Sequence, residues 1–398
     1  MGQLVKVLIA VCSMDPQTGG PPRVVAGHAR ELKRRGHEPV VITTTDAERE
    51  STTRDHWSLA DDGIETHYFR RQSPAVIGRS QEWDDFVNEK IADFDILHIH
   101  GLWKRCLATA ATAARRNRVP YVFAPHGMLD AWSRNRSRWK KSAAKQFLGI
   151  RDLMHHADGV QVGSEEEADE VANAGVGAET FIIPNGVHLD KFHRTPSKNG
   201  VVFEKFPHLS DCDPILLFFN RLHPKKGVLL FLEATAEAIN VHPKLGVLVA
   251  ALAHDKKHEK EVRERALKDD LKTNVAVTTE LVGNQSIEAI NAADGFVLPS
   301  YQEGFSMAVL ESMAYRLPMV ITDTCHMGFV ETESAGYVVP ATKAGVLEGI
   351  LKLVALTDDE RAEMGCRGFN WVSRNGTWES IGEQLDKMYE SVVRQLAS

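Results

Sequence analysis

Two glutamates stand eight positions apart in the stretch SYQEGFSMAVLESMA, residues 300–314. Glu303 lies in a turn-like run beside Gly304, whereas Glu311 lies in an apolar run with helical spacing. Eight residues of continuous helix would separate the two by roughly 12 Å and turn them about 80° apart around the axis. The spacing therefore favours two separate contacts on one long ligand over a catalytic carboxylate pair; two ordinary solvated glutamates are the alternative.

Backbone amides between these glutamates could bind an anion. If Ser306 caps the helix, the N–H groups of Phe305, Ser306 and Met307 lie at a helix amino terminus, where phosphate binds readily. A ligand with hydroxyl groups at both ends and a diphosphate between them would satisfy this arrangement. A nucleotide diphosphate sugar is such a ligand.

A basic loop, FFNRLHPKKG, follows another predicted strand. Arg221 and Lys226 place a guanidinium and an ammonium between that strand and the next helix. This combination suits a diphosphate and would stabilise negative charge on a leaving group. A basic surface loop without a ligand is the alternative interpretation.

Two further positions follow predicted strands in the first half of the chain. Gly19 and Gly20 precede a helix whose first turn tolerates Pro21 and Pro22, so backbone could approach a ligand closely there. His126 follows the strand YVFAP and precedes a glycine. A plain strand-to-helix loop and a structural histidine stay open as alternatives.

The sequence gives little reason to expect a metal. The runs DFD at 93–95 and DCD at 211–213 both precede strands, at the end of the sheet away from the expected binding edge. His98 and His100 could share a strand face, but two ligands do not make a metal site. We therefore expect no metal and no cofactor besides a nucleotide-sugar substrate.

Alternating strands and helices must position these residues. VKVLIAVC and EPVVITT alternate with amphipathic stretches in the first half, and PILLFFN, LGVLVAAL and GFVLPS continue the pattern in the second. Such Val- and Ile-rich strands predict parallel sheets covered on both faces, with ligands outside the carboxyl ends of the strands. The expected fold is α/β, with two Rossmann-like domains facing across a cleft.

The 398 residues exceed one ordinary core, so we expect two domains. The predicted divisions are an N-terminal, acceptor-side domain at 1–190 and a C-terminal, donor-side domain at 191–376. A last helix at 377–398 could pack back on the first domain. The linker is predicted around residues 182–200, where Pro, Asn, Gly and Lys occur without periodicity.

Composition narrows the classes of protein. A net charge of −7 gives no reason to expect a nucleic-acid binder. Five cysteines, without a CxxC pair, argue against a disulfide framework and a zinc site and fit a reducing compartment. The first apolar run is short for a signal peptide, and no run reaches the ~18 apolar residues of a membrane span. We expect a cytoplasmic protein.

The ordered set of motifs resembles the retaining glycosyltransferases of family four, of the group 1 type. RLHPKKG and LPSYQEGFSMAVLESMAYRLPMV resemble the C-terminal domain of that family, including its E-x7-E pattern. PHGMLDAWSRNRSRWKK and the Gly19–Gly20 loop resemble its N-terminal domain, and PNGVHLDKF resembles the start of its linker. The resemblance spans nearly the whole chain and implies the two-domain GT-B architecture.

The resemblance also implies roles for the residues of the second half. Arg221 and Lys226 would bind the donor phosphates, Glu303 the hydroxyls of the transferred sugar, and Glu311 the ribose hydroxyls. Backbone contacts to sugar and diphosphate would come from Phe305, Ser306 and Met307. The candidate catalytic residues are thus His126, Arg221, Lys226 and Glu303. The candidate donor-binding residues are Gly19, Gly20, Phe305, Ser306, Met307 and Glu311.

In the first half, the resemblance places Gly20 near the diphosphate and His126 near the transferred sugar. Three positions depart from the family pattern. The family often has Gly at Arg316 and Asp at His188, and it usually has Gly at Asn220. None of these removes a proposed donor contact, although Asn220 could alter the phosphate loop and Arg316 the junction between helix and strand.

The implied activity is a hexosyltransferase reaction that uses a nucleotide sugar, retains the anomeric configuration and serves polysaccharide, lipopolysaccharide or glycolipid biosynthesis. No enzymic nucleophile is needed if the leaving phosphate takes the proton of the acceptor hydroxyl. Two alternatives stay open. One is a nucleotide-sugar epimerase or hydrolase on the same fold, and the other is a non-catalytic nucleotide-sugar-binding subunit.

The acceptor side is predicted from residues 131–151, which hold seven Arg or Lys, no acid, and the interleaved Trp132 and Trp139. A basic amphipathic helix of this kind could rest on anionic lipid, as a peripheral membrane contact near a lipid-linked acceptor. The alternative is a solvated helix that lines the acceptor side and serves a saccharide acceptor.

Overall fold

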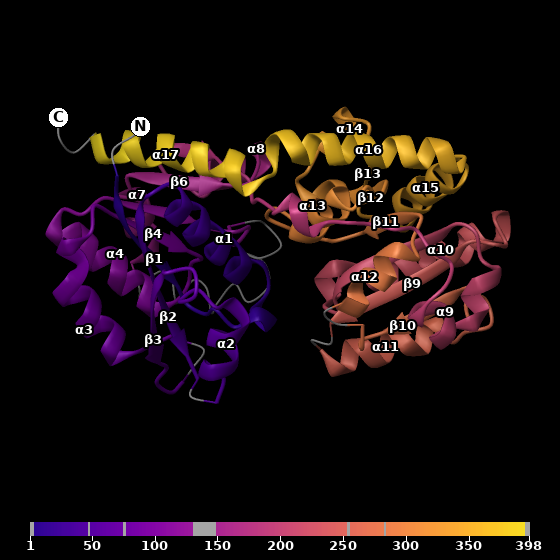
Figure 1. Ribbon diagram of the computed structural model, residues 1–398, viewed down its shortest axis with the longest axis horizontal. Helices are drawn as coiled ribbons and strands as arrows, with labels where there is room; N and C mark the ends of the chain where they lie inside the picture. The colour runs from indigo at the N-terminus through magenta and orange to yellow at the C-terminus, as the bar shows by residue number, and fades with distance from the viewer. Residues whose placement is uncertain are drawn as a thin grey trace. The chain divides into compact units, whose positions relative to one another are not determined.

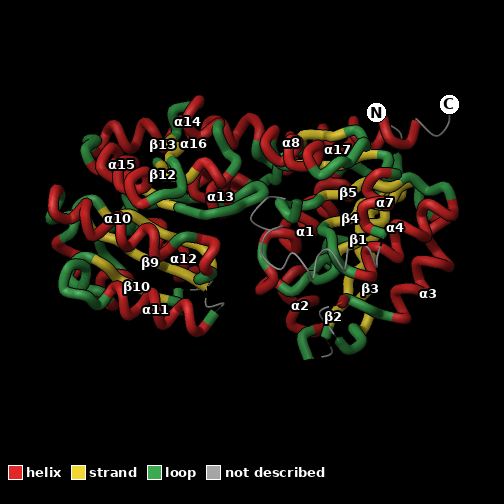
Figure 2. The backbone as a smooth tube through the Cα atoms, turned by 180° about the vertical axis from the view of Figure 1, so that it is seen from behind, coloured by secondary structure: helices red, strands yellow, loops and turns green. Residues whose placement is uncertain are grey.

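The computed structural model describes residues 4–46, 48–74, 77–129, 149–252, 255–281 and 284–394 (Figures 1 and 2). The chain divides into two compact units. The first comprises Met1–Gly186 and Trp378–Ser398, and the second comprises Val187–Thr377. The boundaries predicted from the sequence, at residues 190 and 376, lie within four residues of these divisions.

The first unit is built on a seven-stranded parallel sheet with the order β3-β2-β1-β4-β5-β6-β7. Its central strands are buried along most of their length, as their apolar runs predict. The strands are β1 Lys6–Val11, β2 Glu38–Thr45, β3 Glu65–Arg70, β4 Ile96–His100, β5 Tyr121–Ala124, β6 Gly159–Val162 and β7 Thr180–Ile182.

Helices cover both faces of this sheet (Figure 1). Leu97 and Ile99 of β4 belong to the core beneath α3 and α4. His98 and His100, which alternate with them along the strand, lie on the opposite face, toward α17 and α1. The described helices are α1 Gly20–Arg34, α2 Glu50–Trp57, α3 Gln81–Lys90, α4 Arg105–Asn117, α7 Ile150–His155, α8 Glu165–Asn173 and α17 Trp378–Arg394.

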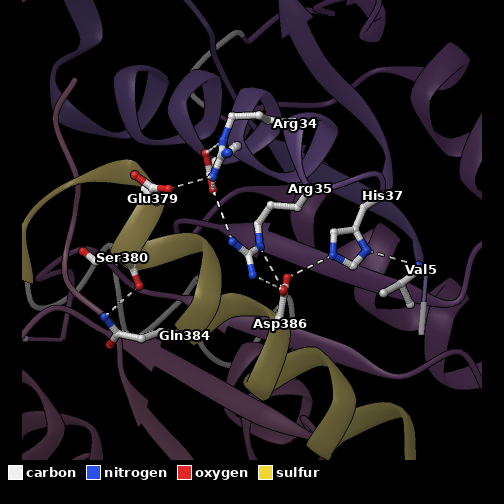
Figure 3. Close-up of polar contacts among 9 residues, drawn as sticks. Val5, Arg34, Arg35, His37, Glu379, Ser380, Gln384 and Asp386 are labelled. Carbon is white, nitrogen blue, oxygen red and sulfur yellow. Dashed lines mark hydrogen bonds and ion pairs between the residues drawn. The ribbon is translucent and has the colours of Figure 1, made fainter. Parts of the chain in front are cut away.

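The last helix, α17, completes the first unit by packing on α1. A Cβ added at Gly27 of α1 would lie 2.0 Å from the Trp378 ring, so the two helices meet at a position where only glycine fits. Polar contacts extend this interface: the Asp386 carboxylate accepts hydrogen bonds from Arg35 at 2.8 Å and from His37 at 2.9 Å (Figure 3). The C-terminal residues are therefore part of the N-terminal domain.

The second unit has a six-stranded parallel sheet with the order β10-β9-β8-β11-β12-β13. The strands are β8 Ile215–Arg221, β9 Gly246–Leu252, β10 Val275–Thr278, β11 Gly295–Leu298, β12 Met319–Thr322 and β13 Gly336–Val339. The helices include α9 Val201–Lys205, α10 Val228–Val241, α11 Lys256–Ala266, α12 Asn284–Asn291, α13 Met307–Ala314, α14 Phe329–Thr332, α15 Lys343–Val354 and α16 Asp358–Asn375.

Two parallel sheets with interleaved helices confirm the predicted α/β class with two Rossmann-like domains. Within the described ranges, no helix combines the length and apolarity that crossing a bilayer would require.

Candidate functional site

The strand order of the second unit reverses at β8, which lies between β9 and β11. Ligands of open parallel sheets bind outside the carboxyl ends of the strands at such a reversal. The basic loop with Arg221 and Lys226 follows β8, and the loop with Glu303 follows β11. Because β8 and β11 are paired neighbours, the two loops leave the same edge of the sheet side by side.

The two loops approach each other closely because of Gly227. This residue has φ +71°, and a Cβ on it would lie 1.9 Å from the carbonyl oxygen of Pro299. The Tyr301 N–H also donates to the Lys225 carbonyl at 2.7 Å. Any side chain at residue 227 would therefore force the basic loop away from the Glu303 loop.

Lys226 and Glu303 form a buried ion pair between these loops. The Lys226 Nζ donates to Glu303 Oε1 at 2.5 Å, and the two side chains are only 6% and 8% exposed. The hydroxyl of Ser300, which is fully buried, donates to the same carboxylate oxygen at 2.6 Å. Glu303 is therefore held in one position before any ligand binds.

Burial raises the pKa of Glu303, but the charges of Lys226 and Lys225 and the hydrogen bonds from Lys226 and Ser300 together lower it below its ordinary value. The carboxylate is thus ionised at neutral pH. Its second oxygen, Oε2, accepts no hydrogen bond from any described residue. Glu303 is suited to accept hydrogen bonds from ligand hydroxyls rather than to donate a proton.

Arg221 ends β8 next to this pair. Burial lowers the pKa of its guanidinium below the ordinary value, and the charge of Glu303 offsets only part of this shift. The backbone N–H of Arg221 donates to Asn220 Oδ1 at 2.8 Å. Asn220, which departs from the family pattern, therefore shapes the start of the loop. The site therefore places positive charge from Arg221 and Lys226 around one carboxylate.

Three residues of this site, Ser300, Lys225 and Gln302, were not predicted from the sequence. Ser300 bonds Glu303, and the Lys225 Nζ donates to Gln302 Oε1 at 3.3 Å. Each of the three lies within three residues of a predicted site residue, which is the signal that could have found them. Their partners lie on the other loop or across a turn, so the sequence alone did not pair them.

Helix α13 begins at Met307, as the motif predicted, and Glu311 lies in its second turn while Glu303 lies outside it. Ser306 occupies the N-cap position and is buried, but its side chain makes no capping hydrogen bond. Ser306 is thus the N-cap residue, as the motif predicted, and the helix starts where expected. Phe305 stacks on Phe329 of α14 with ring centroids 6.2 Å apart, which fixes the approach to the helix.

In the first unit, Gly19 and Gly20 start α1. Gly19 is the N-cap with φ +117°, and the two prolines stand in the first turn as predicted. A Cβ added at Gly20 would meet no described atom within 4 Å. Packing therefore does not require glycine at residue 20, which leaves room for a ligand to approach the helix terminus.

His126 follows β5 with a left-handed backbone, φ +54°, and is half-buried. Its Nε2 lies 3.0 Å from Nδ1 of His100, at the end of the neighbouring strand β4. Burial lowers the pKa of His126 to about 4, so the ring is neutral at pH 7. His98 and His100 lie on one face of β4, as predicted, and both are buried.

The predicted site residues thus fall into two groups, Gly19, Gly20 and His126 in the first unit and the remainder in the second. Contact of one ligand with both groups stays a prediction. The predicted membrane-contacting helix at 131–151 lies outside the described residues except for its last three. Asp93 and Asp95 precede β4, and Asp213 precedes β8, so both DxD runs lie at amino ends of strands, as expected.

Arg316, where the family often has Gly, adopts a left-handed backbone with φ +58°. Glycine takes this conformation without strain, whereas arginine does not. The Arg316 guanidinium lies 3.7 Å from the centre of the Phe369 ring of α16, a cation–π contact that offsets the strain. The departure thus preserves the turn between α13 and β12.

Two family descriptions match this chain. Glycosyltransferase Family 4 matches residues 18–191, and Glycosyl transferases group 1 matches residues 203–371. The chain is also similar to the alpha-monoglucosyldiacylglycerol synthase of Streptococcus pneumoniae. The two are 23% identical over 318 residues, which cover 77% of this chain and 68% of that protein.

A second relative matches over nearly its full length. It is the GDP-mannose:cellobiosyl-diphosphopolyprenol alpha-mannosyltransferase of Xanthomonas oryzae pv. oryzae, 22% identical over 98% of this chain and 97% of that protein. The crystal structure of Anabaena HepE in complex with UDP and glucose superposes with a TM-score of 0.78 at 18% identity, over 97% of this chain and all of that one. The structural likeness shows the shared GT-B fold. With both of its halves matched, this chain belongs to glycosyltransferase family 4, with a group 1 glycosyltransferase domain in its second half.

Proposed function

We propose that this chain transfers a hexose from a nucleotide diphosphate sugar to a hydroxyl acceptor with retention of the anomeric configuration. The observation that carries the proposal is the buried Lys226–Glu303 pair beside Arg221, at the reversal of the strand order. It combines cations for a diphosphate with an ionised carboxylate for sugar hydroxyls.

Donor binding would use the cations first. Arg221 and Lys226 would neutralise the diphosphate, and the amides of Phe305, Ser306 and Met307 would bind it at the start of α13. Lys226 keeps two of its three N–H donors for phosphate after bonding Glu303. The Anabaena protein in complex with UDP and glucose has the same fold, which supports a nucleotide sugar as the donor.

The two glutamates would contact opposite ends of the donor. Glu303 would accept hydrogen bonds from the transferred sugar through Oε2, and Glu311 would bind the ribose hydroxyls. In the first unit, Gly20 would admit the diphosphate to the start of α1, and neutral His126 would bond the transferred sugar. As the sugar leaves the diphosphate, the leaving phosphate oxygen would take the proton of the attacking acceptor hydroxyl on the same face.

The acceptor would be a lipid-linked molecule or saccharide of glycolipid, lipopolysaccharide or polysaccharide biosynthesis. The two relatives named above carry a diacylglycerol and a polyprenol diphosphate in their names, which supports the lipid-linked class. We further propose that the donor binds without a metal, because positive side chains surround the phosphate position. Equal donor turnover in EDTA and in MgCl2 would support this.

The experiment measures nucleoside diphosphate release from UDP- and GDP-sugars, with and without lipid-linked and free saccharide acceptors, and assigns the product anomer by NMR. Acceptor-dependent release with a retained anomer is expected. Release that no acceptor changes would favour an epimerase or hydrolase. Tight donor binding without turnover would favour a non-catalytic subunit, and an inverted anomer would refute the mechanism.

Separate roles for the glutamates are tested by Glu303→Gln and Glu311→Ala. Glu303→Gln should lower kcat, whereas Glu311→Ala should mainly raise the Kd for the nucleoside diphosphate. Glu348→Gln on the exposed face of α15 is the matched control, since among the described residues its carboxylate pairs only with Lys352 of the same helix. Identical effects of the first two substitutions would contradict the division.

A further inference from the structure

Three buried histidines gather on the face of the first sheet that α1 and α17 cover. His28 of α1 meets His98 and His100 of β4, and one ring nitrogen of each lies within 4.8 Å of the others. All three side chains are at most 1% exposed. The sequence indicated only the pair on β4; the third ring comes from a helix 70 residues earlier in the chain.

The cluster leaves nitrogen atoms without partners. Both ring nitrogens of His28 and the Nε2 atoms of His98 and His100 are buried and make no hydrogen bond with any described residue. Proteins rarely leave such groups unpaired, because an unmet buried donor or acceptor destabilises the fold. Unpaired nitrogens on three rings that lie this close together indicate a bound group that all three rings contact.

The other nitrogens are arranged as those of metal ligands usually are. His98 Nδ1 lies 2.8 Å from the Tyr389 hydroxyl of α17, and His100 Nδ1 lies 3.0 Å from Nε2 of His126. A partner at Nδ1 orients the ring and leaves the Nε2 lone pair for a metal.

We propose that His28, His98 and His100 form a binding site for one Zn²⁺ ion, with a water molecule as the fourth ligand. Neutral imidazoles suit Zn²⁺, and three histidines with an open fourth position are an established ligand set for it.

This site would adjoin the proposed donor site through His126, whose Nε2 lies 3.0 Å from Nδ1 of His100. It would tie α1 to β4, and through Tyr389 it would tie both to α17, next to the polar contacts shown in Figure 3. The odd, scattered cysteines that argue against a cysteine-based zinc site do not bear on a histidine site. The inference does not depend on the proposed transfer reaction.

The test measures zinc in the full-length protein. The protein is stripped with EDTA, dialysed against micromolar ZnCl2 and analysed by mass spectrometry for metal, and Co²⁺ is added separately as a spectroscopic probe. One Zn²⁺ per chain, a tetrahedral Co²⁺ spectrum and a higher Tm with Zn²⁺ are expected. Wild-type protein that retains no stoichiometric zinc would overturn the proposal, with the rings then paired to trapped water.

Variants locate the ion. His28→Gln should lose stoichiometric zinc, and Tyr389→Phe should weaken the affinity by about 10–100-fold through the lost partner of His98. His258→Gln is the control, because His258 is also buried with an unpaired ring nitrogen but lies in the second unit. Zinc retained at full affinity by a folded His28→Gln protein would place the ion elsewhere and refute the site.

Discussion

The Lys226–Glu303 pair predicts a specific pattern in the free energy of unfolding. Two unit charges 2.5 Å apart attract by about 7 kcal/mol at an effective dielectric constant of 20, and their desolvation offsets much of that gain. Removing one charge leaves the other buried and unpaired. Lys226→Met and Glu303→Gln should therefore each lower the unfolding free energy by about 3–5 kcal/mol.

The double substitution should cost less than either single one, because neither charge is left unpaired. Gln is chosen at residue 303 because its amide oxygen can still accept the hydrogen bond from Ser300. The assay is urea unfolding followed by circular dichroism. Glu348→Gln, which breaks a pair whose side chains are 52% and 59% exposed, is the control and should cost less than about 1 kcal/mol.

The effect should also depend on pH. The pKa of Glu303 is lower in the folded state than its ordinary value of 4.5, so the ionised pair stabilises the fold above that pH. As the pH falls through the folded-state pKa, this stabilisation is lost, and the difference between wild type and Glu303→Gln should shrink. Single substitutions that cost under about 1 kcal/mol, or costs that simply add, would refute the reasoning.

Three further outcomes follow from close contacts and from one thiol. Gly227→Ala should lower the unfolding free energy by at least ~3 kcal/mol, because the added Cβ would lie 1.9 Å from a carbonyl oxygen. Urea unfolding measures this change, and a loss under about 1 kcal/mol would contradict the prediction. Gly27→Ala should destabilise the protein by a similar amount, because its Cβ would clash with the Trp378 ring. Gly20→Ala should change the stability by under ~1 kcal/mol but weaken donor binding, because no described atom lies near its Cβ. Calorimetry measures both stabilities and a titration measures donor binding; equal destabilisation by the two substitutions would contradict this prediction. The rate of Cys12 alkylation should have its midpoint near pH 6. A hydrogen bond from the Cys106 thiol and nearby positive charges outweigh burial and lower the pKa of Cys12 to about 6. Mass spectrometry follows the adduct, and a midpoint above pH 8 would exclude this prediction.

Much of the fold could be predicted from short stretches of sequence. Val- and Ile-rich runs such as β1 and β9 are buried on both faces, and that burial leaves a continuous apolar signature. Glycines and prolines mark the loops, so α1 and α13 begin where their motifs predict. The candidate residues follow strands because the carboxyl ends of parallel strands form the binding edge.

The partners of those residues depended on the tertiary structure. Lys226 and Glu303 are 77 residues apart, and no local pattern states that their side chains meet. That Ser306 is the N-cap could be predicted from the local motif, but that its side chain is buried and makes no capping hydrogen bond could not.

The sequence by itself determined the α/β class, the order of strands and helices, and the loops that carry the chemistry, because periodicity and turn residues act over a few positions. Only the tertiary structure decided which loops meet, that α17 completes the first unit, and that His28 joins His98 and His100. Strand order and helix packing set these contacts, and both arise from interactions between residues far apart in the chain.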